Sequence, residues 1–274
     1  MAVAFDGTDQ YFKTPSALFS GTSGTDFDIT FVCWARPDNR HTGYVIAADN
    51  GSNYADGWGI YTVSGGKFAM RWESSYKIGT TTFPNGNSTW YHVAGVWQYG
   101  TRTLYLDGAS EATNTSNRAM VLDNADNFYI GNSRLNNYFE GKIAECAAYS
   151  VSLTAAEIET LAAGFSPLFV RPDKLIGYWP LGGTLTPATS GVDATGTDGD
   201  LTAYNSPAEF SHPYQVWPTA QQNIVCPIAP APTIPGQGHD YALPDSVLDY
   251  ASNSRSDYTT PRQAADYGVP NDGT

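Results

Sequence analysis

Residues 90–108 read WYHVAGVWQYGTRTLYLDG, and they carry the clearest strand and turn signals in this chain. Within this stretch, Trp90–Trp97 and Thr103–Leu106 are rich in aromatic and β-branched residues, a composition typical of strands. The short segment between these runs is suited to a turn, and Asp107-Gly108 tolerates the positive φ of a second tight turn. The stretch therefore predicts a hairpin that continues into an antiparallel meander.

Similar runs, separated by clusters of Gly, Asn, Asp and Ser, occur from residue 1 to about residue 150. Short strands at this spacing are typical of a β-sandwich or a β-barrel. The other predicted strands are Phe27–Ala35, Tyr44–Ala48, Trp58–Val63, Phe68–Trp72, Phe128–Ile130 and Lys142–Tyr149.

A single helix is predicted, at Thr154–Ala163. Thr154 and Glu157 have the spacing of a capping box, and Gly164 is suited to the left-handed position that ends a helix. After this short helix, the apolar run at residues 175–181 predicts one more strand, which ends at a proline.

The balance of charge excludes some classes of partner. The chain has 14 Lys and Arg against 27 Asp and Glu, a formal net charge of −13, so a phosphate-neutralising surface for nucleic acid is not expected. No stretch approaches the roughly 18 apolar residues of a membrane helix, and because a strand pattern already starts at Val3–Phe5 we do not expect a secretory leader. Cys33, Cys146 and Cys226 are scattered, which predicts reduced and mostly buried thiols, with a single disulfide as the alternative.

The composition changes after Ser206, where seven prolines fall between residues 207 and 235 and favour an extended polyproline II segment. Beyond them, pairs of Asp and Tyr recur at intervals of 9, 8 and 9 residues. Such a segment buries too little apolar area to order itself alone. We expect residues 207–274 to form an arm that docks on neighbouring chains or, alternatively, on its own sandwich. The expected contact residues are Tyr241, Pro244, Tyr250, Tyr258, Pro261, Tyr267 and Pro270.

Residues 1–165 resemble the concanavalin A-like, laminin G-like jelly roll. The resemblance rests on AFDGTD at 4–9, FDITFVCWARP at 27–37, WYHVAGV at 90–96, LYLDG at 104–108 and GKIAE at 141–145, in that order. It implies an all-β, antiparallel jelly-roll sandwich, to which residues 166–206 add a strand and a loop that complete this sheet or reach a neighbour. In many such modules a segment like GYWPL precedes the FDG strand, whereas here it follows the helix, at 177–181.

Catalytic patterns are not found in the sequence. Glucanases of this fold carry closely spaced carboxylates in the pattern ExDxxE, which the chain lacks, and Glu140 and Glu145 are expected to form hydrogen bonds at strand edges. The four histidines, including His92, lack metal-binding spacing. We therefore expect no enzyme activity and no cofactor. Calcium stays open without an assigned residue, because scattered loop carboxylates can hold it.

A sugar site would combine aromatic faces with a few hydrogen-bonding groups. Trp58, Tyr61, Trp72 and Tyr76 lie in or beside consecutive predicted strands, and Trp58 and Tyr61 must point to opposite faces because they are three residues apart. Trp72 and Tyr76, close to a loop, are the candidate ligand-binding residues. The alternative is that both pack inside the protein.

The sequence is compatible with two functions. The main hypothesis is a non-enzymatic structural module that binds other protein subunits through residues 207–274. Because proteins resembling this jelly roll with such an extension are often bacteriophage virion components, it would be a capsid decoration or tail-fibre protein on the virion surface, assembled in the host cytoplasm without a signal peptide. The alternative is a carbohydrate-binding adhesin module, with glycans as partners and no contact with nucleic acid or membrane.

Overall fold

The computed structural model describes most of the first 211 residues. The described ranges are 2–14, 23–24, 28–49, 57–72, 75–115, 120–121, 127–133, 136–181, 190–191, 201–205 and 207–211. The chain divides into two units, Met1–Trp217 and Pro218–Thr274, and every described residue belongs to the first unit. The arm from residue 212 onward, with its seven expected contact residues, lies outside the described residues, as does Cys226.

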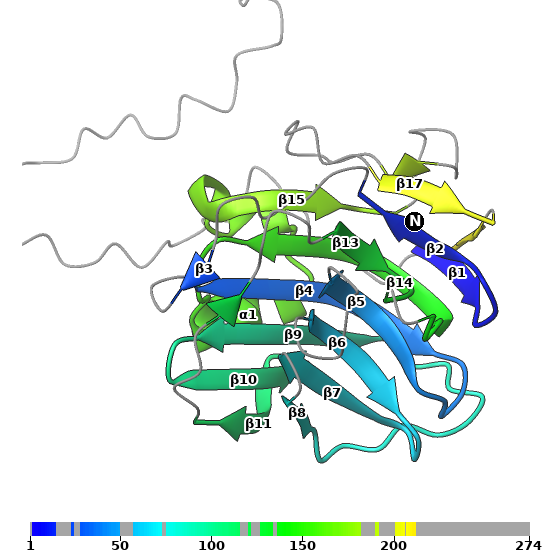
Figure 1. Ribbon diagram of the computed structural model, residues 1–274, viewed down its shortest axis with the longest axis horizontal. Coiled ribbons are helices and arrows are strands. Elements are labelled where there is room, and N and C mark those ends of the chain that lie inside the picture. Colours follow the sequence, from blue (N-terminus) through cyan, green and yellow to red (C-terminus); the bar gives the residue numbers. More distant parts are fainter. Residues whose placement is uncertain are drawn as a thin grey trace, which may run out of the picture. The chain divides into compact units, whose positions relative to one another are not determined.

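Two antiparallel sheets form the sandwich, as the sequence predicts (Figure 1). The first sheet contains, in spatial order, β11 (Ala109–Asn114), β10 (Thr101–Leu106), β9 (Tyr91–Gln98), β4 (Ile29–Pro37), β14 (Glu140–Tyr149), β1 (Ala2–Asp6) and β18 (Ala208–Phe210), with β15 (Leu175–Trp179) also paired to β14. The second sheet contains β16 (Ser190–Gly191), β17 (Leu201–Tyr204), β2 (Tyr11–Lys13), β13 (Asn127–Ile130), β5 (Gly43–Asp49), β6 (Gly57–Val63), β7 (Lys67–Trp72) and β8 (Ser75–Ile78). A separate pair joins β3 (Ser23–Gly24) to β12 (Met120–Val121).

The hairpin predicted from residues 90–108 is formed by β9 and β10, and β10 continues into β11 through a tight turn. Asp107 and Gly108 both have positive φ, +48° and +84°, in that turn. The backbone N–H of His92 donates to Asp107 Oδ1 (2.8 Å), which ties the turn to the neighbouring strand. The meander is therefore confirmed, with strand ends within two residues of those expected.

Strands from the C-terminal part of the sandwich complete both sheets. β1 pairs with the first half of β14 and β15 with the second half, on either side of an irregularity at Glu145, whose φ is +53°. In the second sheet, β17 pairs with β2. The expectation that residues 208–210 belong to the arm is wrong, because they form β18 at the edge of β1, a position that tolerates the preceding Pro207.

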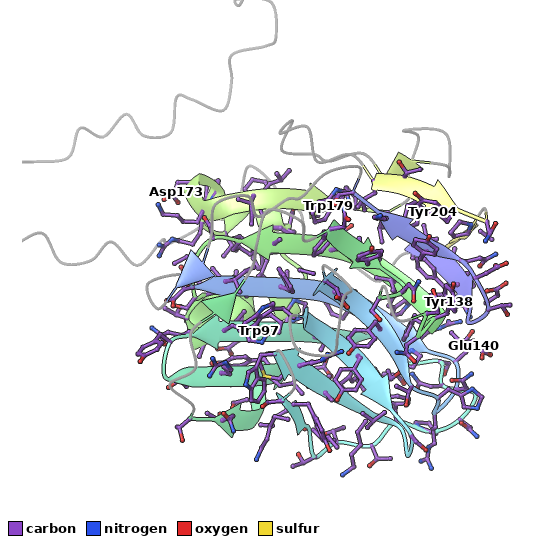
Figure 2. All side chains as sticks on the ribbon, viewed as in Figure 1. Trp97, Tyr138, Glu140, Asp173, Trp179 and Tyr204 are labelled. Carbon is purple, nitrogen blue, oxygen red and sulfur yellow. The ribbon has the colours of Figure 1, made fainter. Side chains whose placement is uncertain are left out.

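Five aromatic rings form a row between the two sheets, which we call the aromatic row. Its members are Trp58 on β6, Trp97 on β9, Phe31 on β4, Phe128 on β13 and Trp179 on β15. Consecutive ring centroids lie 5.9, 5.1, 5.4 and 4.6 Å apart, so the row is continuous between the sheets. Trp97 and Trp179 are labelled in Figure 2. The indole N–H of Trp97 also donates to the carbonyl oxygen of Arg71 on β7 (3.1 Å).

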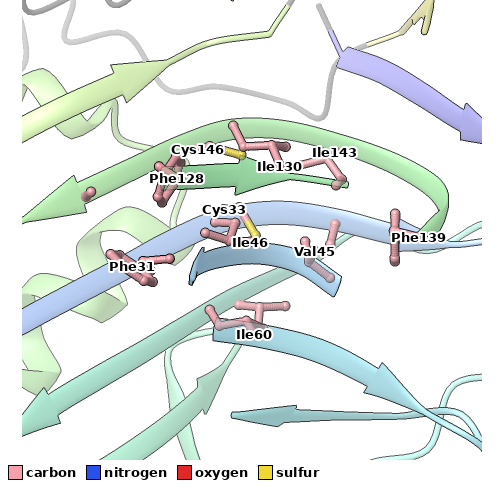
Figure 3. Packing of buried hydrophobic residues seen from close by; sticks show 14 of the residues in the cluster. Phe31, Cys33, Val45, Ile46, Ile60, Phe128, Ile130, Phe139, Ile143 and Cys146 are labelled. Carbon is pink, nitrogen blue, oxygen red and sulfur yellow. The ribbon is translucent and has the colours of Figure 1, made fainter. Parts of the chain in front are cut away.

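Aliphatic side chains and two cysteines pack around the aromatic row (Figure 3). Cys33 on β4 and Cys146 on β14 are buried and free, as the sequence predicts for these two residues. Burial is the largest cause that raises the pKa of the Cys146 thiol, and the adjacent Cys33 thiol raises it further. Both side chains therefore act as small apolar groups in the core.

The helix α1 (Ala155–Ala162) covers the outer side of the first sheet, where Ile158 and Leu161 are buried. Its capping box is present: Glu157 N–H donates to Thr154 Oγ1 (3.3 Å), and Thr154 N–H donates to Glu157 Oε2 (2.8 Å). Two 3₁₀ turns, Pro167–Phe169 and Pro172–Lys174, lead from the helix to β15. Among the described residues, no helix is long and apolar enough to cross a membrane.

His92 lies in this outer layer, on β9. It lines a cavity of about 10 Å³ together with Trp34 and Glu145, room for about one water molecule. Its Nδ1 atom is buried without a hydrogen-bond partner, and burial lowers its pKa to about 3. The imidazole is therefore neutral at physiological pH, and this cavity is too small for a substrate.

Replacing Trp97 by alanine should lower the free energy of unfolding by roughly 3–5 kcal/mol, because it leaves a cavity where two ring contacts and a hydrogen bond meet. Tyr99, on the β9–β10 turn and 42% exposed, provides the control. The Tyr99→Ala variant should change stability by less than about 0.5 kcal/mol. Urea unfolding measures both values, and equal losses in the two variants would contradict the role of the aromatic row.

The buried neutral His92 should make stability depend on pH. Since the folded pKa lies below the unfolded value, protonation favours the unfolded chain, and this contribution is lost as pH falls from about 6.5 toward 3. Between pH 7 and pH 5, the free energy of unfolding of the native chain should fall by about 2 kcal/mol more than that of His92→Gln. The His41→Gln variant, changed at an exposed histidine, should follow the native chain. Parallel pH profiles for all three proteins would show the expectation to be wrong.

Candidate functional site

Tyrosine side chains gather on the outer side of the second sheet. Side chains along a strand point alternately to opposite faces, so Tyr11 and Tyr129 point outward while their neighbours Phe12 and Phe128 enter the core. Four rings sit on strands β2, β5, β6 and β13, and three more come from β8, β17 and the segment before β14. The tyrosine face comprises Tyr11, Tyr44, Tyr61, Tyr76, Tyr129, Tyr138 and Tyr204.

One end of the tyrosine face holds a pocket of about 340 Å³, which we call the arginine pocket. Its lining residues are Thr42, Tyr44, Tyr61, Arg71, Ser75, Tyr76 and Asn137. The rings of Tyr44 and Tyr61 stack with centroids 5.0 Å apart and planes inclined by 21°. Gly59 leaves space for this stack, because a Cβ atom there would lie 3.1 Å from Tyr44 Cδ1.

Hydrogen-bonding groups converge in the arginine pocket. Arg71 Nη1–H donates to the hydroxyl oxygen of Tyr44 (2.8 Å), which orients the phenol. The pKa of Tyr61 is raised, first by burial and then by the nearby Tyr44 and Tyr76, while Arg71 acts in the opposite direction. The Tyr61 hydroxyl therefore keeps its proton and stays both a donor and an acceptor at neutral pH.

The other end of the tyrosine face holds a more polar pocket of about 250 Å³, which we call the asparagine pocket. Its lining residues are Tyr11, Lys13, Asn127, Tyr129, Asn132 and Asn136. Tyr11 forms one wall and stacks flat on Tyr204, with centroids 4.4 Å apart and an angle of 5°. Tyr138, labelled with Tyr204 in Figure 2, also packs against Tyr11. Burial is the largest cause that raises the pKa of Tyr11.

The structure separates the two expected ligand-binding residues. Tyr76 is 60% exposed and lines the arginine pocket. The expectation that Trp72 is exposed is wrong: it is 2% exposed and lies in the core. In the β6–β7 register Trp72 is directly opposite Trp58, and residues in that relation point to the same face. Tyr61 points to the opposite side of β6 from Trp58. It therefore lies on the tyrosine face, whereas Trp72 does not.

The two glutamates considered for catalysis lie in different surroundings. Glu140 accepts a hydrogen bond from the side chain of Asn39. Glu145 is buried and accepts a hydrogen bond from the hydroxyl of Tyr178. Neither residue lines a pocket on the tyrosine face.

No cluster of three or more metal-ligating side chains occurs in the described part of the chain, and the acidic loops considered for calcium lie largely outside it.

Sequence reasoning missed Lys13, Arg71 and the asparagines. Strand pairing brings them together from distant segments: β2 pairs with β13, and β5 lies between β13 and β6. The available signal was the alternation of polar and apolar residues in Tyr11–Lys13 and Asn127–Ile130. It indicates which side chains share a face, but the pairing of the two strands is needed to place them together.

Several solved structures are similar to this chain. A Bacteroides ovatus protein, provisionally described as a carbohydrate-binding protein, is 19% identical, with a TM-score of 0.56 over 76% of this chain and 58% of its own length. The SAP-like pentraxin of Limulus polyphemus is 17% identical over 59% of this chain and 81% of its own, with a TM-score of 0.47. The CBM40 module of a Ruminococcus gnavus sialidase, solved with α2,3-sialyllactose, is 15% identical. The match covers 55% of this chain and 97% of that module, with a TM-score of 0.44.

The likeness to the Bacteroides ovatus protein shows a shared fold and nothing further, and the chain spans 58% of that protein's length. No curated protein sequence matches the chain. A family model does match residues 6–159, more than half of the sequence, and this range contains the capping box of α1 and most strands of both sheets. The chain therefore belongs to the concanavalin A-like lectin/glucanases superfamily.

Proposed function

We propose that the protein binds carbohydrate on the tyrosine face. The observation that carries the proposal is the arginine pocket, where the stacked Tyr44 and Tyr61 rings, the exposed Tyr76 and the Arg71 guanidinium surround one space. A sugar ring has apolar C–H faces and a rim of hydroxyl groups, so it suits a pocket that offers aromatic walls together with a few donors and acceptors.

The size and composition of the pocket support this class of ligand. Its volume of about 340 Å³ falls at the lower end of the roughly 300–1,000 Å³ typical of small-molecule sites. Tyr44 and Tyr61 are buried and already in contact, so little side-chain ordering is required when a ligand binds. Membership of a superfamily named for lectins, and a structural relative provisionally described as carbohydrate-binding, are consistent with it.

Replacing Tyr76 by alanine should weaken glycan binding by about tenfold, near 1.4 kcal/mol, because the exposed ring supplies stacking area at low entropic cost. A glycan array with the full chain identifies a ligand, and calorimetry then compares the variants. Tyr99→Ala, which removes an exposed tyrosine from the first sheet, serves as the control and should bind as the native chain does. The proposal fails if the array shows no ligand, or if Tyr76→Ala binds with native affinity.

The assembly role expected for residues 207–274 is a separate proposal, and display on a virion rests on it. Its support is the spacing of tyrosines and prolines in the sequence. A chain that ends at Ser211 keeps β18, so it retains every described strand. Under this proposal the short chain stays folded and monomeric while the full chain assembles or binds particles, as measured by light scattering. Equal masses and retained particle binding would contradict it.

A further inference from the structure

One residue that lines the asparagine pocket has a buried acceptor without a partner. Asn132 is 2% exposed, lines this pocket, and its Oδ1 atom has no hydrogen-bond partner. The preceding Gly131 fixes the turn after β13: its φ is +82°, and a Cβ atom there would lie 2.5 Å from the Phe5 ring. An unsatisfied buried acceptor costs free energy, which a ligand hydroxyl that donates to it would recover.

A cation lines the same pocket. The Lys13 ammonium lies 5.5 Å from the centroid of the Tyr129 ring, and no carboxylate within the described ranges lies at ion-pair distance from it. The described residues of the lining include no Asp or Glu, although acidic residues outnumber basic ones by 27 to 14 in the whole chain. Lys13 therefore gives this set of lining residues a positive charge, which suits an anionic group.

The asparagine pocket adjoins the arginine pocket. Asn136 lines the former, and its neighbour Asn137 lines the latter. Asn136 Oδ1 accepts a hydrogen bond from the Tyr138 hydroxyl (3.1 Å), and Asn137 accepts one through its carbonyl oxygen from Tyr44 N–H (3.0 Å). A ligand that occupies both pockets must therefore extend over this segment.

We propose that the asparagine pocket binds a carboxylate-bearing sugar residue, such as a uronic acid, within a glycan whose neighbouring residue occupies the arginine pocket. Lys13 pairs with the carboxylate, the Asn132 side chain turns so that its Oδ1 accepts a hydrogen bond from a ring hydroxyl, and the Tyr11 wall packs on the sugar ring. This inference rests on the proposed carbohydrate binding and specifies its ligand as an acidic oligosaccharide.

The matched probes are oligogalacturonate, alginate and hyaluronan oligosaccharides and their carboxyl-reduced forms, which keep the linkages but lose the negative charge. The full chain should bind at least one acidic form about tenfold more tightly than its reduced form, as expected for one charge-assisted contact. Lys13→Gln should remove this preference and leave the affinity for the reduced form within about twofold. Lys77→Gln, changed at an exposed lysine on β8 outside the pocket, should keep the native preference.

Asn132→Ala provides an independent test, since its hydroxyl partner is present in both forms of each probe. The variant should bind both forms about fivefold more weakly, while its melting temperature stays at or above the native value because no internal hydrogen bond is lost. Equal binding of acidic and reduced forms would overturn the acidic-sugar inference and leave carbohydrate binding intact. Equal losses in Lys13→Gln and Lys77→Gln would also overturn it, and absence of all glycan binding would remove both proposals.

Discussion

The aromatic row between the two sheets constrains every strand that contributes a ring to it. Its rings come from five strands, and each ring touches the next across or within a sheet. A register slip of one residue in any of these strands would turn its ring toward solvent. The row thus fixes the strand register. It also requires β15, because Trp179 stacks on Phe128 to form one end of the row.

The same strand register places the tyrosine face on the outer side of the second sheet. With Phe12 and Phe128 held inside, Tyr11 and Tyr129 have to point outward, and the same alternation places Tyr61 beside Tyr44. The outward rings are packed against each other before any ligand arrives. When a ligand binds to a rigid face of this kind, little conformational entropy is lost, because few side-chain rotamers have to be fixed.

The fold was largely predictable from local patterns, whereas the site was only partly so. The β9–β10 hairpin and the capping box of α1 follow from neighbouring residues, whose signals are contained in short windows. Polar edge strands such as β11 carry no apolar alternation and were missed. Trp72 was assigned to the surface because its side depends on a pairing with Trp58 that proximity to a loop does not reveal. Lys13 and Asn132 lie more than a hundred residues apart, so only the β2–β13 pairing joins them.

The first and last described strands of the sandwich are neighbours in space. Ala2 pairs with Phe210 in the first sheet, and β2 pairs with β17 in the second. The order of strands in space therefore does not depend on which of them the gene encodes first. A rearrangement that joined these two points and opened the chain at another turn would keep every strand pair. Modules in which a GYWPL-like segment precedes the FDG strand are thus compatible with this architecture as circular permutants.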